Sequence, residues 1–197
     1  MDAFFDVQRR LKDSSRGVRL GALATLQQLE QAATLAELAD DVVADLADDV
    51  VELLFDSDAS LRENALVTLC KMKPATLAPH VNAVAARLED SDWQVRAAAL
   101  VTLGELEAAT LAKHADAVVH SLEESNGDVR AAATHTLEQL PPSALAQHAV
   151  AMHENNVTSI RNLKTKEYES IVSLYGVIID DNEIIETSTI VVSNNTH

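Results

Sequence analysis

The strongest constraint on the fold of this chain is an internal repeat with a period of 34 residues. Residues 56–89, 90–123 and 124–154 align without a gap, and an earlier copy begins near Ser14. Equivalent positions of the three aligned copies carry arginine (Arg62, Arg96, Arg130), leucine (Leu69, Leu103, Leu137) and histidine (His80, His114, His148). A unit of this length cannot bury its own apolar face, so neighbouring units are expected to stack into a continuous array.

Within each unit, apolar residues recur at the spacing of an α-helix. In the second copy this spacing predicts a first helix over residues 59–72, with Ser57 or Asp58 supplying the N-cap oxygen. Pro74 marks the turn that follows, because proline inside a helix removes a hydrogen bond. A second apolar stripe then predicts a second helix. The expected caps of this second helix in successive copies are Thr76, Thr110 and Ser143.

Composition and charge agree with an all-α fold and restrict the partners. Hydrophobic residues make up 47% of the chain but aromatic residues only 3%, so the core must consist of Ala, Leu and Val. Ala and Leu are among the best helix formers. The formal net charge of −16 argues against nucleic acid and anionic membranes, which attract clustered Lys and Arg. This charge favours solubility or a basic protein partner.

The sequence also carries an expectation about the compartment. The single cysteine, Cys70, cannot form an intramolecular disulfide, which fits a reducing environment. The first residues lack the apolar stretch of a signal peptide, and no run of 18 apolar residues predicts a transmembrane helix. A cytoplasmic location is therefore expected, without membrane attachment.

The segment from Asp90 to Leu106 and its copies resemble HEAT repeats, and the resemblance covers roughly residues 14–154. It implies a right-handed α-α superhelix of about four helical hairpins. It further implies a scaffold or adaptor that binds other proteins and has no catalytic activity of its own. Armadillo and tetratricopeptide arrays are the near alternatives. The tetratricopeptide pattern of Trp, Gly-Tyr and late Pro is absent, and armadillo units contain a third short helix for which a 34-residue unit leaves little room.

The same resemblance implies roles for particular residues. In HEAT repeats, acidic and arginine residues around the turn pair into a ladder. Here this implies pairing of Asp58, Asp92 and Asp128 with Arg62, Arg96 and Arg130. The second helices of such arrays usually form the concave face that holds partners. On this chain that face would offer Asn82, Arg87, Lys113, Asp116 and His120.

The first copy is longer than its siblings and strongly acidic. Arg19 and Arg62 lie 43 residues apart with no Lys or Arg between them, partly because LADDVV occurs twice. We interpret residues 35–55 as one long helix. Its polar face is either simply solvated, a docking patch for a basic partner, or a calcium site. For the calcium alternative, the sequence lacks the glycine that forms the bend of an EF-hand loop. The residues of the docking patch would be Asp40, Asp41, Asp45, Asp48 and Asp49.

The composition changes abruptly near the C-terminus. Residues 1–156 contain no isoleucine, whereas residues 157–197 contain seven and not one alanine. We therefore predict a repeat domain over residues 1–156, with units at about 14–55, 56–89, 90–123 and 124–156, and a non-repeat tail. The tail is disordered, folds as a small β-hairpin around Asp180-Asp181-Asn182-Glu183, or reflects an incorrect gene model.

No catalytic or cofactor motif is found in the sequence. The repeated histidines, His80, His114 and His148, lie on helices about 8–10 Å apart, so they cannot converge on one metal ion. They are expected at the edge of the helix interface, or as a pH-responsive row. The alternative function is an enzyme or chaperone similar to HEAT-like pigment lyases or metal-dependent hydroxylases. The hydroxylase pattern of repeated His-Glu pairs is reduced here to His153-Glu154.

Overall fold

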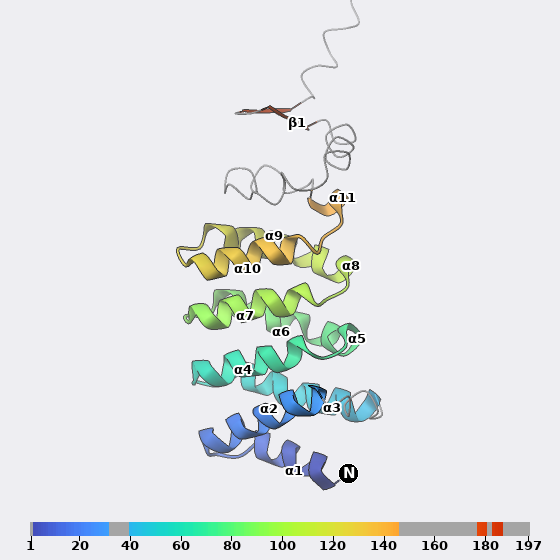
Figure 1. Cartoon of the computed structure of the whole chain (residues 1–197), viewed down its shortest axis with the longest axis vertical. Coiled ribbons are helices and arrows are strands. Elements are labelled where there is room, and N and C mark those ends of the chain that lie inside the picture. The colour runs from blue at the N-terminus through green and yellow to red at the C-terminus, as the bar shows by residue number, and fades with distance from the viewer. Residues whose placement is uncertain (1, 32–39, 146–176, 181–182, 187–197) are drawn as a thin grey trace, which may run out of the picture.

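The computed structural model is an array of helical hairpins stacked along one long axis (Figure 1). It describes residues 2–31, 40–145, 177–180 and 183–186. The predicted all-α solenoid is confirmed, because α4 packs between α2 and α7, and α7 packs between α4 and α10. Among the described residues, no helix is both long and apolar enough to cross a bilayer.

The first helices of the hairpins are continuous, and the second helices are segmented. The first helices are α2 (Arg16–Gln31), α4 (Ala59–Cys70), α7 (Trp93–Gly104) and α10 (Gly127–Leu137). The second helix of the first unit is α3 (Asp40–Glu52) with the 3-10 turn η2 (Leu53–Phe55). The second helix of the second unit consists of α5 (Pro74–Leu77), η3 (Ala78–His80), α6 (Val81–Ala85) and η4 (Ala86–Glu89). The second helix of the third unit consists of α8 (Ala108–Leu111), η5 (Ala112–His114), α9 (Ala115–His120) and η6 (Ser121–Glu123). The second helix of the fourth unit begins as α11 (Pro142–Leu145).

Polar residues cap the first helices. The Asp58 carboxylate accepts a hydrogen bond from the Leu61 amide, as expected, and Asp92 accepts one from the Gln94 amide. In the fourth unit Asn126 takes this role. These side chains satisfy amide groups that have no partner in the first turn of a helix.

The predicted caps of the second helices are wrong. The helices α5 and α8 begin at Pro74 and Ala108, two residues before Thr76 and Thr110. Likewise α11 begins at Pro142, one residue before Ser143. Proline is well suited to the first helical position, because its fixed φ fits the helix and its missing N–H would have no partner there.

A bend in the second helices was not predicted. His80 and His114 have φ, ψ of −99°, 2° and −112°, 6°, and each ends a 3-10 turn. Pro79 precedes His80, but Lys113 occupies the equivalent position before His114. Because both units bend in the same way, proline alone does not cause the bend.

The core consists of aliphatic residues from both helices of each hairpin. Val95, Leu103 and Val118, which the stacking model requires to be buried, have no exposed surface. Leu66 of α4 and Leu100 of α7 are equally buried. On the long helix predicted over residues 35–55, the structure buries Leu46, Val50, Leu53 and Leu54. The beginning of that predicted helix, residues 35–39, lies outside the described residues.

A helix that the repeat pattern does not include covers the N-terminal end of the array. This helix, α1 (Asp2–Leu11), packs against α2 and α3. Val7 and Leu11, one turn apart on its inner face, are 2% and 1% exposed. In later units this side of the hairpin is covered by the preceding hairpin, and in the first unit α1 covers it instead.

Threonine hydroxyls link successive first helices inside the core. Thr136 donates to the carbonyl oxygen of Leu100 in the preceding helix at 2.8 Å. The Thr102 hydroxyl lies 3.1 Å from the carbonyl oxygen of Leu66 in the preceding helix and shares its hydrogen with the Ala98 carbonyl oxygen of its own helix, at 2.7 Å. Thr102 and Thr136 are at most 1% exposed. A buried hydroxyl needs a hydrogen-bond partner, so each threonine favours one position of its helix against the preceding one.

The arginine ladder is present, but its pairing differs from the prediction. Arg62 makes two hydrogen bonds to the Asp90 carboxylate of the next unit, at 2.7 and 2.8 Å. Its remaining amino group donates to the carbonyl oxygens of Asp56 and Ser57. Asp58, the predicted partner, caps α4 and pairs with Arg16 instead.

Other units repeat this arrangement. Arg19 pairs with Asp56 at 3.0 Å, and Arg96 pairs with Glu124 at 3.0 Å. Asp92, predicted to pair with Arg96, serves as the cap of α7. For Arg130, the described contacts are to the carbonyl oxygens of Glu124 and Ser125. Each ladder arginine therefore donates hydrogen bonds to carbonyl oxygens of the loop before its own helix. Arg19, Arg62 and Arg96 also pair with an acidic side chain of the following unit.

Two strands are described in the tail. β1 (Val177–Asp180) and β2 (Glu183–Glu186) pair antiparallel, with Val177 opposite Glu186 and Asp180 opposite Glu183. These strands correspond to the hairpin alternative for this segment. The other tail residues lie outside the described part of the chain, and the domain boundary near residue 156 stays a prediction.

Two adjacent residues of α7 test the burial that holds the array together. Leu100 is fully buried and Val101 is 43% exposed. Leu100→Ala is expected to lower the free energy of unfolding by about 2–5 kcal/mol, because it leaves a cavity between hairpins. Val101→Ala, the matched control, is expected to cost less than about 1 kcal/mol. Urea denaturation followed by circular dichroism measures both, and equal losses would contradict the assignment of the core.

The Arg62–Asp90 pair predicts an acid-sensitive stability. Burial raises the pKa of the Asp90 carboxyl, but the hydrogen bonds from Arg62 and from the Asp92 amide, together with the positive charges of Arg62 and Arg87, outweigh burial and lower this pKa below its usual value. A carboxyl with a lowered folded-state pKa stabilises the fold above its unfolded pKa, and this contribution is lost as pH falls through the folded value. Asp90→Asn leaves the Arg62 charge buried and should cost about 3 kcal/mol at neutral pH.

The melting temperature of the wild type and of this variant, measured between neutral and strongly acidic pH, checks the prediction. The difference between the two proteins should shrink as the pH falls below about 4. Glu89→Gln removes the same charge from the neighbouring, exposed side chain and should change little. A difference that is independent of pH would show that the ion pair contributes no stability.

Candidate functional site

The second helices present a charged face that repeats from unit to unit. Asp48 on α3, Asn82 on α6 and Asp116 on α9 occupy equivalent positions 34 residues apart, and all three side chains are exposed. Asp45 and Glu52 are exposed one turn to either side of Asp48. We call this surface the second-helix face and define it by Asp45, Asp48, Glu52, Asn82, Lys113, Asp116 and His120.

Most residues predicted for a partner-binding face lie on this surface. Asn82, Lys113, Asp116 and His120 are exposed. His120 also lies 3.6 Å from Glu123 on the same helix. These four side chains are therefore accessible to solvent on the second helices of two successive units.

Arg87, the fifth residue predicted for that face, lies half-buried at the junction of two units. Its guanidinium donates to the Leu54 carbonyl oxygen at 3.0 Å and lies 5.3 Å from the centre of the Phe55 ring. It also lies 3.5 Å from the Asp90 carboxylate. These contacts connect the first and second units, so the side chain has a structural task that its sequence position did not reveal.

The structure divides the predicted acidic patch. Asp45 and Asp48 are exposed, but Asp49 is only 8% exposed. The helix α3 begins at Asp40, and the side chains of Asp40 and Asp41 lie outside the described part of the chain. The exposed and buried acids thus have different surroundings, although they follow one another in the sequence.

Asp49 is paired with a residue from the other side of a cavity. Its Oδ1 atom lies 2.7 Å from the Lys12 Nζ atom, just beyond the end of α1. This hydrogen bond, reinforced by the charge of Asp49, raises the pKa of the Lys12 ammonium above its usual 10.5. Lys12 therefore remains fully protonated at neutral pH.

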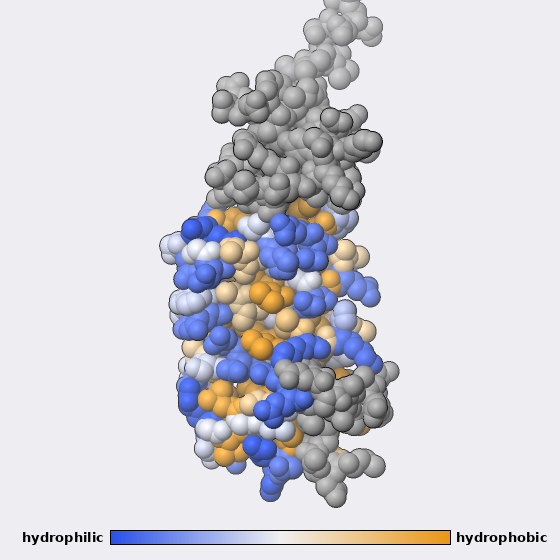
Figure 2. Space-filling model, viewed as in Figure 1, coloured by the Kyte–Doolittle hydropathy of each residue, from blue (hydrophilic) through white to orange (hydrophobic). Residues whose placement is uncertain are grey.

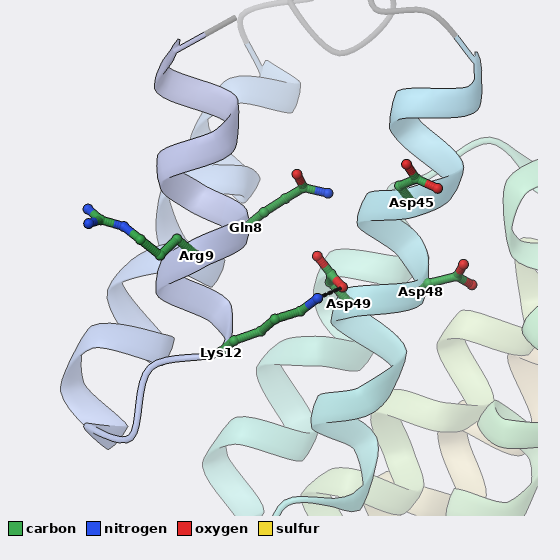
Figure 3. A pocket seen from close by; sticks show the side chains of 6 residues that line it. All are labelled: Gln8, Arg9, Lys12, Asp45, Asp48 and Asp49. Atoms are coloured by element: carbon green, nitrogen blue, oxygen red, sulfur yellow. Dashed lines mark ion pairs between the residues drawn. The ribbon is translucent and has the colours of Figure 1, made fainter.

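The cavity between α1 and α3 is polar and has a volume of about 410 Å³ (Figure 3). Its lining residues are Gln8, Arg9, Lys12, Asp45, Asp48 and Asp49. In Figure 3, Gln8 and Lys12 extend from α1 toward α3, whereas Arg9 points away. The repeat pattern begins near Ser14 and gives no sign of this cavity, although Val7 and Leu11 of α1 have the spacing of one helical turn.

The repeated histidines lie beside the second-helix face. The Nε2 atom of His80 is 3.5 Å from the Asp48 carboxylate of the preceding unit, and His114 is half-buried at the equivalent position. The third member, His148, lies outside the described residues. Within residues 2–31 and 40–145 and the two strands, no three His, Cys, Asp or Glu side chains are grouped to hold a metal ion.

Apolar side chains are also exposed on the first helices. In the view of Figure 2, apolar side chains gather along the middle of the face formed by the first helices. Val67 of α4 and Val101 of α7, at equivalent positions, are 36% and 43% exposed there. Exposed valines thus repeat on successive first helices, as the exposed polar residues Asp48, Asn82 and Asp116 repeat on successive second helices.

Comparison with known proteins agrees with this architecture. Residues 47–138 match the family model described as HEAT repeats. No curated protein sequence matches the chain significantly.

Solved structures of repeat proteins resemble the chain as folds. The crystal structure of an engineered protein superposes with a TM-score of 0.65 and 14% identity, covering 88% of this chain and 77% of the other. A computationally designed armadillo repeat protein for modular peptide recognition gives a TM-score of 0.55 and 15% identity, covering 87% and 82%. A further designed armadillo repeat protein gives 0.55 and 16%, covering 91% and 77%.

The stacked hairpins, the arginine ladder and the family match agree: the chain folds as an α-solenoid of the HEAT and armadillo kind, and its residues 47–138 match HEAT repeats.

Proposed function

We propose that this chain is a scaffold or adaptor without catalytic activity, and that it binds a basic, extended segment of a protein partner along the second-helix face. HEAT and armadillo arrays are a protein-binding kind of domain, so the fold supports the general class. The basic character of the partner is the more specific part of the proposal and rests on the charges of this chain.

The observation that carries the proposal is the row of equivalent polar side chains at Asp48, Asn82 and Asp116, all exposed on successive hairpins. Neighbouring helices pack roughly 8–10 Å apart, and an extended peptide advances about 3.3 Å per residue. Each hairpin therefore corresponds to about three peptide residues. The two carboxylates would meet basic side chains about six residues apart, with a polar residue midway.

Two further features support an extended basic ligand. The net charge of −16 produces a field that accelerates encounters with cationic partners. One structural neighbour was designed for modular peptide recognition, which shows that an array of this fold can be shaped to hold a peptide. A partner that is acidic or a nucleic acid would be repelled by the same field.

Charge reversal on the second-helix face tests the proposal. A fluorescent peptide with lysines six residues apart should bind, and fluorescence anisotropy at low and moderate salt measures its affinity. The double variant Asp48→Lys, Asp116→Lys should weaken binding by roughly tenfold or more, a change of about 1.4 kcal/mol per factor of ten.

The matched control places the same charges away from this face. Glu105 and Glu138 are exposed at the ends of the first helices, so Glu105→Lys, Glu138→Lys changes the net charge equally. Equal loss of affinity in both double variants would mean that only net charge matters. A wild-type chain that fails to bind any lysine-rich or arginine-rich peptide would refute the proposed function.

A further inference from the structure

We propose that the cavity between α1 and α3 is a seat for one lysine or arginine head group of the bound segment, and that Lys12 fills this seat until the partner displaces it. This inference rests on the proposed function, because it assigns a specific subsite to one basic residue of the partner. Lys12 is then an internal competitor for the ligand.

The seat is defined by a carboxylate that requires a cation. Asp49 has a side chain only 10% exposed, and its described ion pair is the 2.7 Å contact with Lys12. A charged carboxylate removed from water is costly unless a positive group neutralises it. The Lys12 ammonium therefore shows which chemical group the cavity accepts at this position.

Lys12 is able to leave the seat. Its side chain is 58% exposed and follows the last residue of α1, Leu11, so its head group can move into solvent without disturbing the apolar contacts of that helix. Ion pairs with one well-exposed partner contribute little stability, because the cation is well hydrated when the pair opens. A guanidinium or ammonium from a partner would restore the same pairing with Asp49.

The cavity can hold a second side chain and is continuous with the proposed binding face. Its volume of about 410 Å³ lies in the range of roughly 300–1,000 Å³ that is usual for ligand pockets. Asp48 belongs to both the cavity lining and the second-helix face. In Figure 3, Asp49 faces α1 while Asp48 projects from the other side of α3. A segment running past Asp48 can thus place a neighbouring side chain near Asp49.

Arg9 provides a matched comparison within the same cavity. It is 80% exposed and pairs with Asp6 of its own helix at 2.6 Å. Figure 3 shows its side chain pointing away from α3. Removing Arg9 or Lys12 changes the charge of the cavity lining by the same amount, but only Lys12 occupies the seat.

The affinity test uses the full chain, the lysine-containing peptide and fluorescence anisotropy. Lys12→Met should tighten binding by about fivefold or more relative to Arg9→Met, because a binding site that is no longer blocked raises the apparent affinity. Asp49→Asn should weaken binding and should cancel the gain when combined with Lys12→Met. Circular dichroism verifies that each variant is folded.

A second measurement needs no substitution in the cavity. Acetylation of Lys12 by acetic anhydride, followed by mass spectrometry, should be slow in the free chain and several times faster when the peptide is bound. The ion pair with Asp49 protects the amine in the free state, because acetylation requires the deprotonated form, and release exposes it.

The outcomes separate the two proposals. Suppose that Asp48→Lys, Asp116→Lys weakens peptide binding, that Lys12→Met and Arg9→Met change the affinity equally, and that Lys12 is acetylated no faster in the complex. These results overturn the displacement of Lys12 and leave the proposed function intact. Absence of peptide binding in the wild type and in every variant overturns the proposed function and this inference together. A larger gain for Lys12→Met than for Arg9→Met, with faster acetylation in the complex, supports it.

Discussion

The apolar face of each hairpin is buried only because another hairpin lies against it, and the rest of the structure depends on this contact. Leu66, Leu100 and Leu103, which belong to successive first helices, are fully buried. Because each unit contacts mainly its neighbours, the stability of the array is a sum of local interfaces. The same geometry repeats the exposed positions of the second helices at a fixed spacing, which makes the charged face possible.

The polar contacts between units determine how the apolar faces meet. Hydrophobic burial has little directional preference, whereas the two parallel hydrogen bonds from Arg62 to Asp90 require one relative position of the two units. The Thr102 hydroxyl, within hydrogen-bond distance of the Leu66 carbonyl oxygen, adds a second polar contact between the same two first helices. Leucine contacts thus supply most of the attraction, and these hydrogen bonds fix the register.

Much of the fold could be predicted from the sequence, because a repeat shows its apolar positions several times. The hairpins and the burial of Val95 and Leu103 follow from periodicity alone, whereas the sequence left the cap of α4 open between Ser57 and Asp58 and the structure selects Asp58. The partner of Arg62 does not, because Asp58 and Asp90 are both plausible by spacing and only the three-dimensional contact of two units selects Asp90. Similarly, the bend at His80 and His114 depends on packing that a helical pattern cannot show.

The candidate site was less predictable than the fold, for a related reason. Exposed positions such as Asn82 and Asp116 follow from the repeat once the buried stripe is known. The burial of Asp49 does not, because it depends on α1, which precedes the repeats and has no sibling to reveal it. Neither the contacts of Arg87 with Leu54 and Phe55 nor the cavity beside α1 has a signature within a single unit.

The ladder gives the array a direction and makes its middle units interchangeable. Each of these units offers an acid to the arginine behind it and an arginine to the acid ahead, as Asp90 and Arg96 do. A copied or deleted block of 34 residues therefore meets the same kind of junction at both of its ends. Such a chain can grow or shrink in whole modules during evolution without a new interface, because every junction between middle units uses the same pairing.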